Sequence, residues 1–267
     1  MDTDRRSLMT SGVLGVVAGL TAQTAATVAS GSTAPAGMQE ATAARQLRQV
    51  AAAYQVSNCM NRYTAMESLG HVSDMENEFA TNVSDVQVDV GFGWYYGAPG
   101  VHRFCEVNGL LIGDANRGSF INGATFLFGN TSEIVEVAED LKTAKGLWLT
   151  WFAMTTGNAA TGFKPRWGCA RRAVDFIQAN GEWKIWHYFV YGLINTPPGQ
   201  AWTDSDVVAD NQSTNNDWIP EALKPDRPSA YGIGNAGGWR PDRPMIQVRV
   251  PVSYRTFAET FSYARTL

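Results

Sequence analysis

The chain has 267 residues, of which 45% are hydrophobic and 17% charged, and its formal net charge is −4. Such a composition can bury a large core and shows no basic excess, so it excludes global disorder and argues against a nucleic-acid partner. Its three cysteines, Cys59, Cys105 and Cys169, are too few and too far apart for a disulfide framework or a close-spaced zinc motif. We expect small buried hydrophobic residues there, with one disulfide as the alternative.

The N-terminus is typical of a twin-arginine export signal. Arg5 and Arg6 precede a mildly apolar run from Gly12 to Leu20, which is shorter than the ~20 apolar residues that span a bilayer. Two small-residue cleavage sites stay open, at 24–26 and 34–36. We expect a signal peptide over 1–36, no membrane span, and a periplasmic or secreted protein; a disordered tail or a lipid-free anchor is the alternative.

Helical periodicity follows the signal. No Pro or Gly interrupts residues 41–69, where apolar residues recur in two series, Leu47, Val50 and Tyr54, then Val56, Met60, Tyr63 and Glu67. Gly70 is expected to end this helix. Ser73 and Glu76 fit a capping box for a second, short helix that buries Met75 and Phe79.

A strand and a third helix are predicted next. Alternating apolar residues over 86–92 indicate a half-buried strand, which residues 94–97 extend into a turn at 98–100. The third helix should contain Val101, Phe104 and Cys105. A Gly- and Asn-rich loop covers 113–123.

The second half of the chain predicts long antiparallel strands at 124–138, 143–156, 166–179 and 182–195. Asn180-Gly181 between the last two is a strong two-residue hairpin signal. An extended arm over 197–244 follows, then an edge strand over 245–252 and a terminal helix over 254–263. Together these elements predict an α+β fold, in which a curved antiparallel sheet wraps around N-terminal helices.

Several segments in this order resemble the SnoaL-like branch of the nuclear transport factor 2 (NTF2-like) superfamily. They are VSNCMNRYTAMESLGHVSDMENEFA, WYYGAPGVHRFC, SEIVEVAEDLKTAKGLWLT and WGCARRAVDFIQANGEWKIWHYFVYGLINTP, within about residues 45 to 200. The resemblance implies an NTF2-like cone over 41–200, whose hollow holds the ligand, and a C-terminal extension over 201–267. The superfamily includes dehydratases, isomerases, cyclases and formaldehyde-removing lyases, and also non-catalytic binding modules, so the fold alone does not settle the function.

The sequence contains three histidines, and we assign an expected role to each. Strand alternation puts His187 on one apolar face with Trp183, Ile185, Phe189 and Tyr191. That face should line the hollow, where His187 is either a general base or a satisfied core histidine. His71 is expected to cap a helix end, and His102 to lie on a solvated face. Many relatives carry histidines on the strand that here holds Phe126 and Phe128, so only pocket lining is carried over to those positions.

An acid, a phenol and a guanidinium are expected near His187. A two-residue hairpin register pairs Val174 with His187 and Arg172 with Phe189, which places Arg172 on the inner face. A one-residue bulge would place Arg171 there instead. A buried arginine requires a counter-charge, and Glu67 is the obvious one. The resemblance also implies that Tyr63, one turn before Glu67, points into the hollow. Trp94, Tyr96, Trp151 and Trp167 are candidate stacking walls.

These residues predict a cofactor-independent lyase without a metal, acting on a bulky hydroxylated aromatic or polycyclic substrate by dehydration or by retro-aldol loss of a small aldehyde. His187 would take the proton, while Tyr63 and Arg172 would hold the developing oxyanion. Two alternatives are an isomerase in the same pocket and an exported, non-catalytic carrier of an aromatic ligand. Assembly through the open sheet face is a third, and a homodimer or higher homo-oligomer is compatible with all of these.

Overall fold

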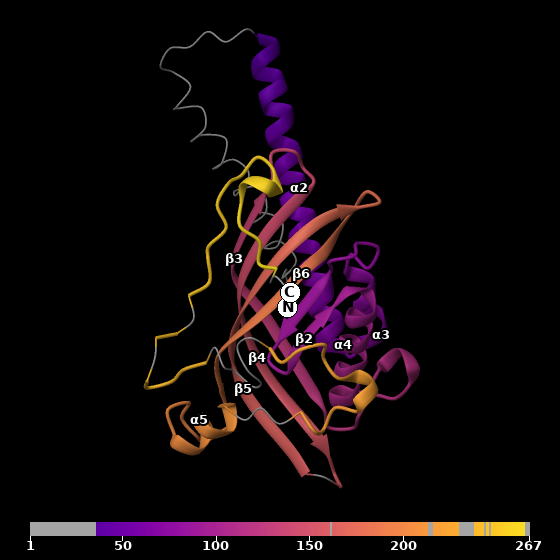
Figure 1. Ribbon diagram of the computed structural model, residues 1–267, viewed down its shortest axis with the longest axis vertical. Coiled ribbons are helices and arrows are strands. Elements are labelled where there is room, and N and C mark those ends of the chain that lie inside the picture. The colour runs from indigo at the N-terminus through magenta and orange to yellow at the C-terminus, as the bar shows by residue number, and fades with distance from the viewer. Residues whose placement is uncertain are drawn as a thin grey trace, which may run out of the picture. The chain divides into compact units, whose positions relative to one another are not determined.

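The computed structural model describes residues 36–160, 162–212, 216–229, 238–242, 244–245 and 247–264. The chain divides into two compact units, 1–46 and 47–267. The first helix begins in the first unit, and the other elements labelled in Figure 1 belong to the second. The predicted signal peptide lies outside the described residues, apart from Ala36. Among the described helices, none is both long and apolar enough to cross a membrane.

The first helix contains both apolar series, and only the second of them is buried. Helix α2 runs from Ala36 to Leu69, and Val56, Met60, Tyr63 and Glu67 are all buried on it. Leu47, Val50 and Tyr54 are instead exposed, at 70, 68 and 69%. The two-residue step from Tyr54 to Val56 turns the helix by about 200°, so the two series lie on opposite faces.

The second helical segment is shorter than predicted. Helix α3 spans Val72–Met75, and a 3₁₀ turn follows over Glu76–Glu78. The predicted capping box is wrong, because His71 occupies the N-cap position and Ser73 lies inside the first turn. The Ser73 hydroxyl instead accepts a hydrogen bond from the Asn116 amide. Met75 and Phe79 are buried as expected.

Residues 87–112 form a hairpin and a helix. Strand β1 (Gln87–Val90) pairs with β2 (Gly93–Tyr96), and α4 follows over Gly97–Ile112. The predicted continuous strand is therefore two strands, and β1 is buried on both faces rather than one. The expected turn at 98–100 is wrong as well, because these residues form the first turn of α4, where a helix tolerates Pro99.

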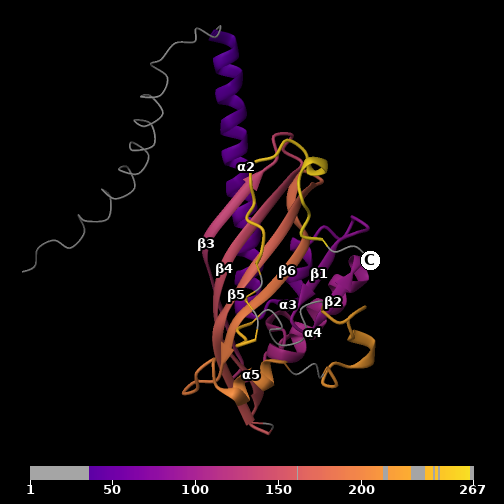
Figure 2. The same cartoon turned by 60° about the vertical axis from the view of Figure 1, so that its left-hand side comes forward.

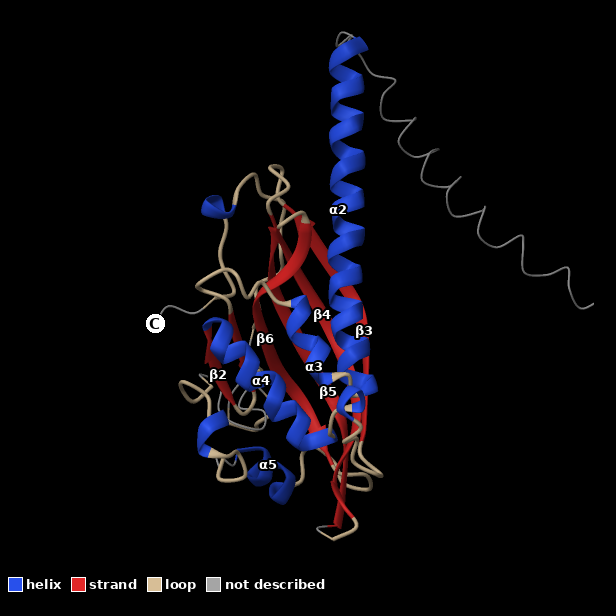
Figure 3. Cartoon of the chain, turned by 90° about the vertical axis from the view of Figure 1, so that its right-hand side faces the viewer, coloured by secondary structure: helices blue, strands red, loops and turns tan. Residues whose placement is uncertain are grey.

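One mixed sheet of six strands contains the remaining strands of the described chain, in the order β2-β1-β6-β5-β4-β3. The long members are β3 (Thr125–Val137), β4 (Thr143–Asn158), β5 (Gly162–Ala179) and β6 (Glu182–Thr196). All neighbours are antiparallel except β1 and β6. The strands are long and curved, with α3 and α4 on one side (Figure 3). The predicted α+β architecture is thus confirmed, and we call the helix-bearing side of the sheet its inner face.

The hairpin between β5 and β6 follows the predicted register only near its turn. Phe176 pairs with Ile185, but Asp175 pairs with His187, so Trp186 is an extra residue on β6. From His187 to Gly192, β6 side chains therefore lie on the face opposite to the predicted one, until a second extra residue, Leu193, shifts the register again. Val174 pairs with Tyr188 rather than with His187, and Arg172 pairs with Val190. The expected inner position of His187, Phe189 and Tyr191 is therefore wrong, and Tyr188 lies on the inner face in their place.

The C-terminal extension is less regular than predicted. Helix α5 (Ser205–Gln212) interrupts the expected extended arm, and residues 247–264 contain one 3₁₀ turn, Phe257–Glu259, in place of the predicted strand and helix. This last segment follows the face of the sheet opposite to the helices, which we call the outer face (Figure 2). Its side chains, rather than a strand ladder, hold it there, so a periodicity-based prediction does not apply to it.

Candidate active site

The inner face carries a buried ion pair between β5 and α2. An Arg172 amino group donates a hydrogen bond of 2.7 Å to Glu67 Oε2, and the other donates one of 3.0 Å to Thr64 Oγ1. Arg172 and Glu67 are 2 and 7% exposed. The predicted pairing is confirmed. The extra residue of the hairpin lies on β6 and not on β5, so Arg171 does not take the inner position.

Two titratable groups of this cluster are shifted toward their neutral forms. Burial raises the pKa of Glu67 above its ordinary value, and the charge of Arg172 opposes this rise. Burial also raises the pKa of Tyr63. The Tyr63 hydroxyl has no well-placed hydrogen-bond partner among the described residues, and its ring lies 5.1 Å from that of Tyr188. A proton acceptor, a phenol and a cation therefore meet in a water-poor environment.

Side chains of the edge strand β3 hold the cation in place. Asn130 donates to Thr64 Oγ1 at 2.9 Å and accepts from the Thr150 hydroxyl at 2.8 Å. The Arg172 guanidinium lies 4.8 Å from the centre of the Phe128 ring, within cation–π range. Sequence reasoning missed Thr64, Asn130 and Thr150. The available signal was strand alternation, which places the polar Asn130 on the same face of β3 as Phe126 and Phe128.

A surface groove opens directly over this cluster. It has a volume of about 390 Å³ and lies between the last turns of α2 and the edge strand β3. It is lined by Asn61, Thr64, Ala65, Ser68, Leu69, Phe128 and Asn130. Thr64, Phe128 and Asn130 also contact Arg172 or its partners, so the groove leads toward the buried charge.

Most predicted wall residues lie away from this site. Phe126 and Phe128 are on the inner face, with ring centres 5.8 Å apart. Tryptophans 151 and 167 point to the outer face, where they are 46 and 37% exposed. Trp94, Tyr96, Arg171, Phe189 and Tyr191 also lie on the outer face by strand alternation. On β2 it is Tyr95 that faces inward, against Phe104.

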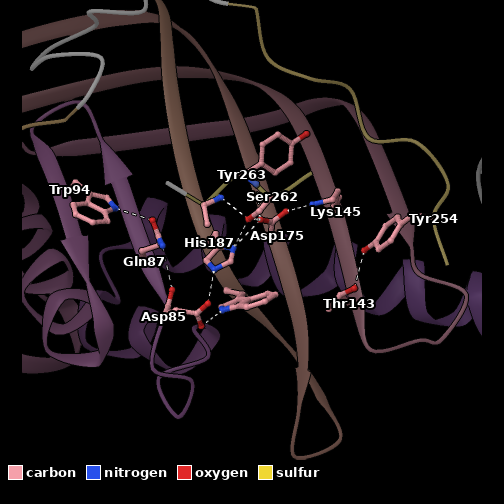
Figure 4. A network of polar contacts seen from close by, with 12 residues as sticks. Asp85, Gln87, Trp94, Thr143, Lys145, Asp175, His187, Tyr254, Ser262 and Tyr263 are labelled. Carbon is pink, nitrogen blue, oxygen red and sulfur yellow. Dashed lines mark hydrogen bonds and ion pairs between the residues drawn. The ribbon is translucent and has the colours of Figure 1, made fainter. Parts of the chain in front are cut away.

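His187 belongs to a separate cluster on the outer face (Figure 4). Its Nδ1 lies 2.8 Å from Asp175 Oδ2 and 3.3 Å from the Ser262 hydroxyl. Its Nε2 is buried, and the nearest carboxylate, Asp85, is 3.7 Å away. The sheet separates this imidazole from Arg172, so the expected inner general base is corrected. Of the other histidines, His71 lies at the N-cap position of α3 without a capping hydrogen bond from its side chain, which instead lies 2.6 Å from Asn116 Oδ1. His102 is exposed, as expected, with its Nδ1 2.9 Å from Glu76 Oε2.

The described residues contain no group of three or more His, Cys, Asp or Glu side chains that could hold a metal ion. The three cysteines are free and buried, which confirms the expectation for them. Burial raises the pKa of the Cys59 and Cys105 thiols, so neither is a ready nucleophile.

No protein-family model and no curated protein matches the chain. Solved structures with similar folds include a proposed scytalone dehydratase from Novosphingobium aromaticivorans, with 12% identity, a TM-score of 0.44, and coverage of 60% of this chain and 99% of that one. An NTF2-like protein with a cystatin-like fold from the same organism is similar at 16% identity and a TM-score of 0.41, covering 59% and 90%. A type 2 hexachlorocyclohexane dehydrochlorinase is similar at 13% and 0.44, covering 60% and 97%.

One of these structures is described as NTF2-like, which is the superfamily that the sequence segments resemble. Their TM-scores lie below 0.5, so the reaction of this chain has to be inferred from its own residues on the inner face, Tyr63, Glu67 and Arg172.

Proposed function

We propose that this chain is a cofactor-independent lyase, and that it removes water or a small aldehyde from a bulky hydroxylated aromatic or polycyclic substrate. The observation that carries the proposal is the buried Arg172–Glu67 pair of 2.7 Å beside the buried Tyr63 hydroxyl, beneath a groove of about 390 Å³. A carboxylate whose pKa is raised by burial is suited to accept and return a proton.

In this proposal Glu67 takes the role first expected of His187. For dehydration, Glu67 accepts a proton from a carbon next to a carbonyl group, and the C–H electron pair forms the new double bond. The hydroxyl group then leaves with that proton as water, and Glu67 returns to its carboxylate form. Arg172 and Tyr63 bind the carbonyl oxygen while it carries negative charge.

The retro-aldol alternative uses the same groups. Glu67 accepts the proton of the substrate hydroxyl, the neighbouring C–C bond breaks, and a small aldehyde leaves. The remaining carbanion, conjugated with the oxygen held by Arg172 and Tyr63, takes the proton back. Phe128 beside the groove would contact the ring system and help to exclude water. Both reactions begin with proton removal and need no redox partner.

Mass spectrometry of the purified protein with a panel of lignin-dimer, polyketide and steroid-like alcohols tests this proposal. Loss of water or of formaldehyde from any of them supports it, and Glu67→Gln should lower that turnover by about 10²–10⁴-fold. Glu78→Gln is the matched control, since Glu78 is also buried and paired with an arginine, Arg62, but lies outside the site. Equal losses in the two variants would contradict a catalytic role for Glu67.

A non-catalytic carrier of an aromatic ligand is the second candidate, and one observation favours it. Glu67 already neutralises the charge of Arg172, so the pocket is electrostatically balanced before a ligand binds. Such a pocket can bind a neutral aromatic compound without reacting with it. Retention of an unchanged compound by the protein would support the carrier and contradict the lyase. An isomerase would instead convert the substrate without a change in mass. We also propose that the chain acts outside the cytoplasm, as the N-terminal sequence predicts, and as a homo-oligomer.

A further inference from the structure

The segment of residues 247–264, which we call the C-terminal clasp, covers part of the outer face. Tyr263 packs with Leu147, Ala173, Phe189 and Tyr191 in a hydrophobic cluster separate from the main core, and the half-buried Val248 and Phe261 lie against it. The clasp is also tied to the turn between β3 and β4, where Glu139 and Asp140 donate backbone hydrogen bonds to Tyr254 and Arg255. The clasp therefore shields these outward-facing strand side chains from solvent.

One carboxylate connects the clasp to the sheet. Asp175 Oδ1 accepts a hydrogen bond of 2.6 Å from Lys145, and Oδ2 accepts hydrogen bonds of 2.8 Å from His187, from the Ser262 hydroxyl and from the Tyr263 backbone (Figure 4). Despite its burial, the hydrogen bond from His187 and the charge of Lys145 hold the pKa of Asp175 below its ordinary value. Two of its four donors come from the clasp.

The clasp also surrounds the ammonium group of Lys145. Lys145 Nζ lies 4.6 Å from the ring centre of Phe257, 4.5 Å from that of Phe261 and 5.3 Å from that of Tyr263. Lys145 is fully buried, and a buried ammonium is stable only when its charge is matched and its surroundings are polarisable. Clasp and ion pair therefore depend on each other.

The extra residue of the β6 bulge contacts the same segment. The Trp186 ring lies 4.7 Å from that of Phe257 in the clasp and 4.1 Å from the His187 ring, and its indole nitrogen donates to Asp85 at 2.7 Å. The bulge thus lies where Asp175, His187 and the clasp meet.

The sequence of β6 does not by itself select this register. Beyond Trp186 one face carries Phe189 and Tyr191 and the other carries Tyr188 and Val190, so both faces are apolar. Where both faces of a strand are apolar, the hydrophobic pattern specifies its register weakly. Without the bulge, Val174 would pair with His187, and Tyr188 would leave the inner face.

We propose that Lys145, Asp175, His187 and Ser262 form a positioning cluster for the inner site: by binding the clasp they hold the bulge at Trp186, and the bulge places Tyr188 against Tyr63. The inner site is the group Tyr63, Glu67 and Arg172, and its role in catalysis rests on the proposed function. The effect of the cluster on the strand register is measured without a substrate, so the positioning role and the lyase activity can each fail independently.

Cross-strand backbone contacts measured by nuclear magnetic resonance on the full chain test this role. The wild type should pair Val174 with Tyr188. Asp175→Asn leaves a single acceptor oxygen for four donors, so we expect this contact to be lost and a Val174–His187 contact to appear. Ser262→Ala, a milder change, should make the amides of residues 185–188 exchange with solvent about tenfold faster. Ser253→Ala is the matched control, because Ser253 is also in the clasp but bonds to Glu136 on the surface.

A folded Asp175→Asn protein that keeps the Val174–Tyr188 contact would overturn the proposal. If Asp175→Asn does not fold, Ser262→Ala decides. Faster exchange at residues 185–188 in Ser262→Ala, absent from Ser253→Ala, supports the cluster, and equal exchange in the two serine variants overturns it.

Discussion

At the scale of single residues, the electrostatics of the inner face depend on Arg172 and its counter-charge. A guanidinium that is 2% exposed has lost its hydration, and Glu67, Thr64 and the Phe128 ring replace it. The raised pKa of Glu67 shows that desolvation outweighs the attraction of the cation for this carboxylate. The Arg172–Glu67 pair therefore affects both the proposed proton transfer and the stability of the fold.

We expect removal of one partner to cost more than removal of both. Arg172→Met would leave a buried carboxylate unpaired and should lower the free energy of unfolding by about 3–5 kcal/mol. Adding Glu67→Leu should recover most of this loss, because replacing a whole buried pair by apolar residues is often neutral. Urea denaturation of the two variants and the wild type measures the difference. A double variant no more stable than Arg172→Met would show that the two side chains do not act as a pair.

At the scale of elements, the β5–β6 hairpin combines a turn set by its sequence with a register set by its surroundings. Asn180 and Gly181 have φ values of 54° and 84°, as a two-residue turn of type I′ requires. The register stays regular from this turn to Phe176 and then shifts at Trp186. Local turn chemistry therefore determines the first few pairs only.

Gly181→Ala tests the contribution of the turn. A Cβ atom at Gly181 would meet nothing within 4 Å, so the cost should come from the positive φ alone, about 1 kcal/mol. Gly129→Ala is the control, because Gly129 has equally open surroundings without a positive φ, and it should be neutral or slightly stabilising. Thermal unfolding of both variants provides the measurement. Equal midpoints would mean that the left-handed conformation at Gly181 carries no cost.

At the scale of the whole molecule, the outer face of the sheet has two parts. The clasp covers Leu147, Phe189 and Tyr191, while Leu127 and Trp151 remain 58 and 46% exposed. A homo-oligomer that uses this face would have to contact the second part or displace the clasp. Within the described residues the protein thus offers a smaller apolar surface than the strand patterns alone suggest.

Export is the prediction that concerns the whole chain. Replacing Arg5 and Arg6 together by Lys should leave the protein in the cytoplasm, because the twin-arginine pathway recognises that pair. Cell fractionation followed by immunoblotting measures the distribution, and a single substitution of Arg45 serves as the control. Continued export of the double variant would contradict this reading of the N-terminus.

The sequence by itself determined the features that depend on local spacing. Val56, Met60, Tyr63 and Glu67 share one helical face because their steps match the helical repeat. The long strands and their turn were predictable in the same way. The Arg172–Glu67 pair could also be predicted, since a buried guanidinium needs an acid and the α2 face offered one.

Only the tertiary structure decided which face of β6 looks inward. The bulge at Trp186 is stabilised by Asp175, Lys145 and a clasp more than sixty residues further along the chain, and no local pattern encodes that contact. For this reason His187 was expected in the hollow and lies on the opposite face, and Tyr188 takes the inner position. Since side chains on a strand alternate, one extra residue was enough to exchange them.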